Sequence, residues 1–149
     1  MRLRSAIFDM DGTLLDSMHI WDGLGANTLR DLGYEPEPDL YERLKRLTVR
    51  DGAQYCKDRY HMPQSVEEIT AATEARVEDF YTHQVQLKPG VLPFLSLLKM
   101  EGVEMYVATN TDRHLAQAAL RHTGIDGYFR GLITCGEVGV GKAESPLIY

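Results

Sequence analysis

The apolar run Ala6-Ile7-Phe8 leads directly into two aspartates, Asp9 and Asp11, which are separated by one residue. An apolar run followed by the turn residues Gly12-Thr13 predicts a buried strand that stops here. In open α/β sheets the carboxyl ends of the strands are where ligands bind. If Met10 turns away from that edge, both carboxylates face one pocket, and their shared negative charge calls for a cation. The segment therefore predicts an α/β chain that carries out phosphoryl chemistry, with Mg²⁺ as the cation because it prefers such oxygen ligands.

The alternative is a solvated acidic turn, which Asp-x-Asp-Gly alone would favour. The flanking Phe8, Thr13 and Asp16 favour the functional interpretation. With them the segment resembles the phosphatase and phosphomutase branch of the haloacid dehalogenase (HAD) superfamily, whose first motif reads Asp-x-Asp-Gly-Thr or Asp-x-Asp-Gly-Val. The resemblance implies that Asp9 is the nucleophile and forms an aspartyl-phosphate, that Asp11 is the general acid and base, and that both hold Mg²⁺, Asp11 through its backbone carbonyl.

Length and composition limit the other possibilities. A chain of 149 residues fits about one domain at ~150 residues each. The formal net charge of −6 argues against nucleic acid as a partner, since phosphate contacts need a basic surface. We find no long apolar stretch and no secretory signal, so we expect a cytoplasmic protein without membrane association. Cys56 and Cys135 have no metal-binding spacing and are expected to be small buried hydrophobic residues.

Helical periodicity dominates residues 17–86. Apolar residues recur at helical spacing from Ile20 to Leu32, before Gly33, and again in three later segments. Thr48 is expected to cap the segment that follows it, and Ser65 with Glu68 forms a capping box for the next. This stretch is therefore expected to be all helix.

The α/β pattern resumes after the connector Lys88-Pro89-Gly90. The sequence then predicts a helix ended by Gly102, a strand over 103–108, a helix that Asp112 caps and Gly124 ends, and a strand over 132–135. The HAD resemblance implies a Rossmannoid parallel sheet, incomplete in this chain, formed by residues 1–16 and 87–149. It also implies that residues 17–86 are an inserted α-helical cap, joined to the core by two linker strands, 16–20 and 85–89, and closing over the pocket.

The strand over 103–108 leads to Thr109 and Asn110. The Thr109 hydroxyl and the Asn110 amide N–H are candidates for holding a phosphate oxygen near the next helix. An ordinary helix cap is the alternative. The HAD resemblance favours phosphate binding, because its second motif is a hydrophobic strand ending in Thr or Ser.

Lys142 follows Gly139-Val140-Gly141 and resembles the third HAD motif, in which a lysine neutralises the nucleophile and the phosphate. One more residue separates it from Pro146 than is usual in the family. A solvated surface lysine is the alternative.

The sequence is expected to be a fragment, because the HAD family continues past the position of Tyr149 to a strand bearing further metal-binding acids. The first strand would then be an open sheet edge, through which the chain could associate with a second copy. A magnesium-dependent phosphatase acting on a small phosphorylated metabolite is the function we expect. A sugar phosphomutase of the β-phosphoglucomutase kind and a catalytically silent truncated module stay open as alternatives.

Overall fold

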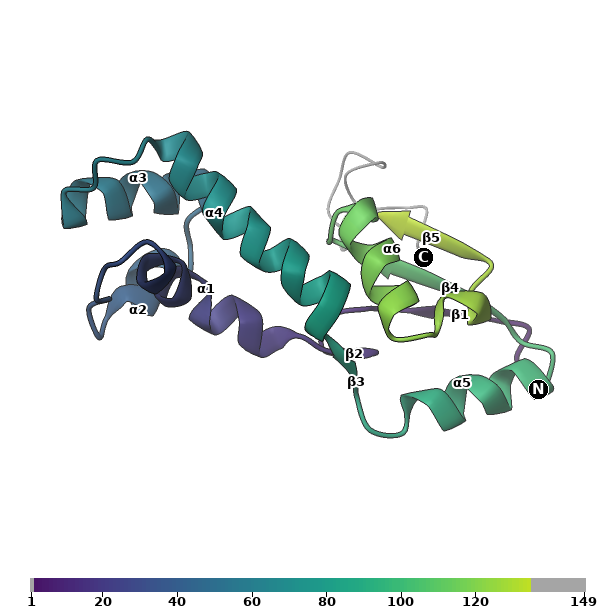
Figure 1. Cartoon of the computed structure of the whole chain (residues 1–149). Helices are drawn as coiled ribbons and strands as arrows, with labels where there is room; N and C mark the ends of the chain where they lie inside the picture. The colour runs from purple at the N-terminus through teal and green to yellow at the C-terminus, as the bar shows by residue number, and fades with distance from the viewer. Residues whose placement is uncertain (1, 135–149) are drawn as a thin grey trace. The chain divides into compact units, whose positions relative to one another are not determined.

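The computed structural model describes residues 2–134, which fold into two compact units. The first unit takes in the described residues up to Ser17 and those from Tyr81 onward. The second unit is the continuous segment Met18–Phe80. Figure 1 shows a parallel sheet in the first unit and helices in the second. The expectations for Cys135 and Lys142 lie outside the described residues.

A parallel sheet organises the first unit. Within the described residues it has the strand order β1-β4-β5, with β1 at Ser5–Phe8, β4 at Glu104–Thr109 and β5 at Gly131–Thr134. Both neighbouring pairs are parallel, with Phe8 opposite Val107 and Thr109 opposite Thr134. The predicted α/β fold with a parallel sheet is confirmed, and β1 lies at the edge of this described sheet.

Two helices connect the strands of this unit. Helix α5 (Val91–Met100) precedes β4, and α6 (Arg113–His122) leads from β4 toward β5, followed by the 3-10 turn η2 (Asp126–Tyr128). Gly102 and Gly124 follow these helices with positive φ, which glycine adopts without steric cost. Asp112 stands at the start of α6, but its side chain makes no capping hydrogen bond, so the predicted cap is wrong in this detail.

Two short strands of the first unit stand before and after the helical unit in the sequence. β2 (Leu15–Asp16) pairs antiparallel with β3 (Gln86–Leu87). The predicted linkers over 16–20 and 85–89 are therefore only partly extended, because helix α1 already begins at Met18. Gln86 is likewise in a strand, so the prediction of an all-helical 17–86 is wrong at that end.

The second unit contains four helices: α1 (Met18–Asp31), α2 (Leu40–Leu44), α3 (Val49–Tyr60) and α4 (Val66–Asp79). The π-helical turn η1 (Phe80–Gln84) follows α4 and leads from the second unit back into the first. The predicted caps are confirmed. The Thr48 hydroxyl accepts from the Asp51 amide at 3.1 Å, and Ser65 and Glu68 form a reciprocal capping box. Such caps satisfy backbone donors that the first helical turn leaves without partners.

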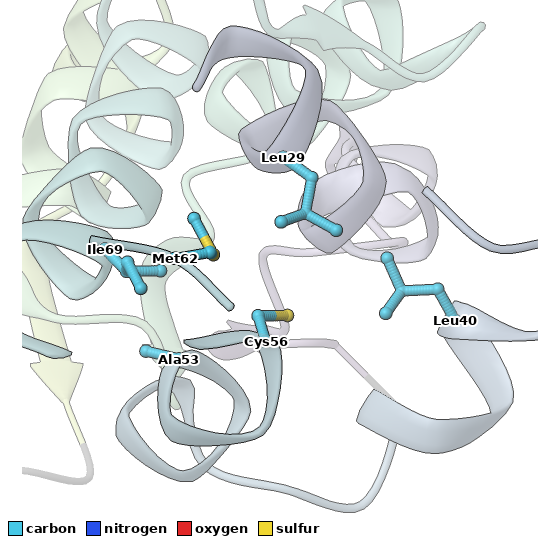
Figure 2. Close-up of a cluster of buried hydrophobic side chains, with 6 residues drawn as sticks. All are labelled: Leu29, Leu40, Ala53, Cys56, Met62 and Ile69. Atoms are coloured by element: carbon cyan, nitrogen blue, oxygen red, sulfur yellow. The ribbon is translucent and has the colours of Figure 1, made fainter. Parts of the chain in front are cut away.

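Apolar side chains from the four helices and the loops between them hold this unit together. Figure 2 shows the buried cluster of Leu29, Leu40, Ala53, Cys56, Met62 and Ile69. The apolar face of each helix meets the others here, and burial of this kind supplies most of the stability of short helices.

The buried Cys56 thiol is expected to be chemically inert. Burial raises its pKa to about 11, so about one molecule in a thousand carries the reactive thiolate at pH 8. In a Cys135→Ser background, we expect iodoacetamide to alkylate Cys56 at least about tenfold more slowly in native protein than in urea-unfolded protein. Equal rates in the two states, followed by mass spectrometry, would show that Cys56 is accessible and ionised.

Candidate active site

A tight turn after β1 presents the two aspartates. The carbonyl oxygen of Met10 accepts hydrogen bonds from the amides of Thr13, Leu14 and Leu15 at 3.0 to 3.3 Å. The Met10 side chain is fully buried, whereas Asp9 and Asp11 on either side of it are partly exposed. The predicted turning-away of Met10 is thus observed, and it leaves both carboxylates on the accessible side of the turn.

The carboxylate of Asp11 accepts hydrogen bonds from three hydroxyl groups. Ser17 Oγ and Tyr81 OH both donate to Oδ1, each at 2.6 Å. Thr111 Oγ1 donates to Oδ2, also at 2.6 Å. These lengths are typical of hydroxyl donors on a charged acceptor, a stronger class of hydrogen bond than that between neutral groups. Asp11 is therefore held in one orientation by three separate parts of the chain.

Sequence reasoning missed these three hydroxyl residues. Ser17 follows the acidic motif closely, and its position there was an available signal. Thr111 follows the predicted strand end at Thr109, so it could have been assigned to the same sheet edge. Tyr81 gave no local signal, because it lies 70 residues from Asp11 and reaches it only through the fold.

Asp9 lies directly after the last residue of β1. Thr13 Oγ1 donates to its Oδ2 in a long hydrogen bond of 3.4 Å. The side chain is partly exposed and has further interactions within the structure. The bond from Thr13 to Asp9 is long and weak by itself, whereas short hydroxyl bonds reach both oxygens of Asp11.

The end of β4 lies beside the acidic turn, as the bond from Thr111 to Asp11 shows. Thr109 is the last residue of β4, almost fully buried, and its hydroxyl accepts from the Thr111 amide at 3.1 Å. Asn110 is exposed. The structure therefore brings Asp11, Thr109 and Thr111 to one sheet edge, as expected for the carboxyl ends of neighbouring parallel strands.

The main chain around Asp11 forms a bridge to Leu15. That bridge is made by the Met10 carbonyl, which accepts from Leu15, and by the Gly12 amide, which donates to Leu15. The carbonyl of Asp11 itself takes no part in these two bonds. Across residues 2–134 we find no group of three or more His, Cys, Asp or Glu side chains suited to a metal ion.

Together, the parallel sheet and the acidic pair after its first strand define an α/β protein with a candidate phosphoryl-transfer site. The chain belongs to the haloacid dehalogenase-like hydrolase family, whose family model matches residues 3–149. The resemblance found in the sequence is thereby confirmed, and so is the assignment of the fold.

Two relatives illustrate the range of the family. The chain is 24% identical over 147 residues to a phosphorylated carbohydrates phosphatase of Thermotoga maritima, covering 99% of this chain and 68% of that protein. It is 31% identical over 139 residues to a phosphoglycolate phosphatase of Agrobacterium fabrum, covering 89% of this chain and 58% of that protein. Both relatives are phosphatases, and the chain spans roughly three fifths to two thirds of their lengths.

A solved structure shows the same fold. The crystal structure of a putative β-phosphoglucomutase from Thermotoga maritima superposes with a TM-score of 0.86 at 24% identity, covering 99% of this chain and 68% of that one. In the part of our chain that the structure describes, no helix has the length and apolarity needed to cross a bilayer.

Proposed function

We propose that this chain is the catalytic part of a magnesium-dependent phosphomonoester hydrolase that works through an aspartyl-phosphate. The observation that carries the proposal is the arrangement of the two neighbouring carboxylates: three short hydroxyl bonds fix Asp11, and Asp9 stands beside it directly after β1. A fixed carboxylate suits proton transfer, and a second one beside it suits nucleophilic attack. The names of the relatives, phosphatases of small phosphorylated compounds, support the same reaction class.

The proposed reaction has two steps. In the first, an Asp9 oxygen attacks phosphorus, the bond from phosphorus to the leaving oxygen breaks, and Asp11 gives its proton to that oxygen. In the second, Asp11 takes a proton from water, the water oxygen attacks phosphorus, and the bond to Asp9 breaks. One difficult hydrolysis thus becomes two easier displacements.

Magnesium fits the donors at the acidic turn. The Asp9 carboxylate and the Asp11 carbonyl, which the bridge to Leu15 does not use, would hold the ion, with water and substrate phosphate as further ligands. The Asp11 carboxylate is a poor ligand in this arrangement, because hydroxyl groups bind both of its oxygens. The bound cation would reduce repulsion between Asp9 and the phosphate.

Thr109 and Asn110 are proposed to bind the phosphate oxygens beside Asp9, since they stand at the end of the adjacent strand. In the described geometry the Thr109 hydroxyl already accepts from the Thr111 amide, which leaves its own hydrogen available for donation. Lys142 stays a proposed countercharge on the basis of its sequence motif alone.

The helical unit Met18–Phe80 is proposed to act as the cap that selects the substrate. It contains a cavity of about 400 Å³ with a mainly apolar lining that includes Trp21 and Lys45. Such a unit could bind the non-reacting part of a phosphorylated metabolite and exclude water. Self-association through the edge of β1 is a further proposal, supported by the position of that strand in the described sheet and the half-exposed Ile7.

Phosphate release from a panel of phosphomonoesters tests the proposed function. The full-length gene product is assayed with Mg²⁺ against phosphoglycolate, hexitol phosphates and hexose phosphates. We expect free phosphate from at least one of them and loss of turnover with excess chelator. Activity that persists without divalent cations, or no phosphate release from any compound, would contradict the proposal.

A phosphomutase is the second candidate, favoured by the fold shared with a putative β-phosphoglucomutase. It differs in returning the phosphoryl group to another hydroxyl instead of to water. Incubation with a hexose 1-phosphate separates the two, because a mutase yields the 6-phosphate and a phosphatase yields free sugar and phosphate.

A further inference from the structure

The two residues that flank the helical unit in the sequence donate hydrogen bonds to the same oxygen atom. Ser17 is the last residue before the helical unit and Tyr81 is the first after it, and both hydroxyls donate to Asp11 Oδ1 at 2.6 Å. Both side chains are completely buried. Polar groups are rarely placed in such positions without a defined hydrogen-bonding role, because burying them costs free energy unless they are paired.

The hydroxyl donors leave few acceptor positions open on Asp11. A carboxylate oxygen offers about two acceptor positions, so Ser17 and Tyr81 fill those of Oδ1. Thr111 fills one position of Oδ2. Among the hydrogen bonds of the described residues, one position on Oδ2 is therefore left to carry a proton.

We propose that Tyr81 is a positioning residue of the active site: with Ser17 it occupies Oδ1 of Asp11, so that Oδ2 is the oxygen that exchanges the proton. This inference rests on the proposed function of Asp11 as general acid and base. The proton on Oδ2 goes to the leaving oxygen as its bond to phosphorus breaks, and Oδ2 later receives a proton from water.

Two features of Tyr81 suit it to this task. The π-helical turn η1 that contains it is a local irregularity at the end of α4, and such turns occur frequently at functional sites. Its phenol is rigid apart from two side-chain torsions, so its oxygen is held more firmly than that of a longer flexible donor. A phenylalanine at this position would keep the ring and remove the hydrogen bond to Asp11.

The test compares leaving groups that need a proton with one that does not. In the first step phenyl phosphate requires the general acid, whereas 2,4-dinitrophenyl phosphate releases a stable anion without it. For Tyr81→Phe we expect the single-turnover release of phenol to fall by about 10- to 100-fold, a part of the ~10²–10⁴ that a general acid supplies. Release of 2,4-dinitrophenol should change by less than about threefold, with KM for both compounds nearly unchanged.

Controls separate positioning from folding. Tyr60→Phe removes a comparable, partly buried hydroxyl, which accepts from the Glu37 amide at 2.8 Å inside the helical unit, and it should leave both release rates unchanged. Ser17→Ala removes the other donor to Oδ1 and should reproduce the leaving-group selectivity even if Tyr81→Phe folds poorly. Thermal unfolding of every variant identifies any loss that comes from instability.

Equal losses for both phosphate esters, or no loss for either in Tyr81→Phe and Ser17→Ala, would overturn the inference. A failure of the proposed phosphatase function gives a separate result, because the unmodified protein would then release neither phenol nor 2,4-dinitrophenol.

Discussion

Replacement of Asp9 by Asn is expected to lower phosphomonoester turnover by about 10⁴-fold or more, the scale of loss seen when a covalent nucleophile is removed. An amide cannot attack phosphorus as a carboxylate does, and it is a weaker magnesium ligand. The fold should persist, because Asn keeps the side-chain shape and the Asp9 side chain is only partly buried at the end of β1. Phosphate release and thermal unfolding measure the two effects separately.

The matched control for this variant is Asp126→Asn. Asp126 is an exposed aspartate at the start of η2, outside the acidic turn. It loses the same charge without touching Asp9, so turnover should stay within about twofold, as for an ordinary surface substitution. Substantial turnover in Asp9→Asn would remove Asp9 from the nucleophile role.

Loss of the Asp11 carboxylate is expected to slow both chemical steps by ~10²–10⁴-fold, the usual contribution of a general acid or base. Asp11→Asn is the more informative variant. It keeps an acceptor for Ser17 and Tyr81, and its amide can donate to the Thr111 hydroxyl, so the three contacts can persist. Asp11→Ala should show a similar fall in turnover. It should also lower the free energy of unfolding by about 1–3 kcal/mol, because the buried hydroxyls of Ser17 and Tyr81 lose their acceptor.

Magnesium dependence should survive in both Asp11 variants, since the proposed ligand at this residue is its carbonyl oxygen. Steady-state phosphate release measures the fall in turnover, magnesium titration measures the retained dependence on the ion, and denaturant unfolding measures the loss of stability in Asp11→Ala. A variant with unaltered turnover would mean that Asp11 does not transfer the proton.

The sequence was informative wherever one local pattern decided the structure. The period of the apolar residues located α1 and α4, and the capping residues Thr48 and Ser65 marked where two helices begin. Apolar runs ending at polar residues identified the parallel strands β1 and β4. In each of these segments the hydrophobic period and the end signals agree, which is the condition under which sequence reasoning works.

Features that depend on contacts between distant parts of the chain could not be predicted from local sequence patterns. The two-residue strands β2 and β3 exist because Leu15 and Asp16 meet Leu87 and Gln86, and strands this short have no period of their own. Asp112 occupies a capping position without making the bond that its residue type favours. Tyr81 reaches Asp11 across 70 residues, so its bond to that carboxylate depends on how η1 folds back onto the acidic turn.

Trapping and locating the covalent intermediate tests the nucleophile role of Asp9 without relying on a variant. The full-length gene product is mixed with Mg²⁺ and a phosphomonoester that it hydrolyses, quenched in acid within the first turnover, and treated with borohydride, which reduces an aspartyl-phosphate to homoserine. We predict homoserine at position 9 by peptide mass spectrometry, and none in Asp9→Asn. Reduction at any other residue, or continued turnover with no residue modified, would contradict an aspartyl-phosphate on Asp9.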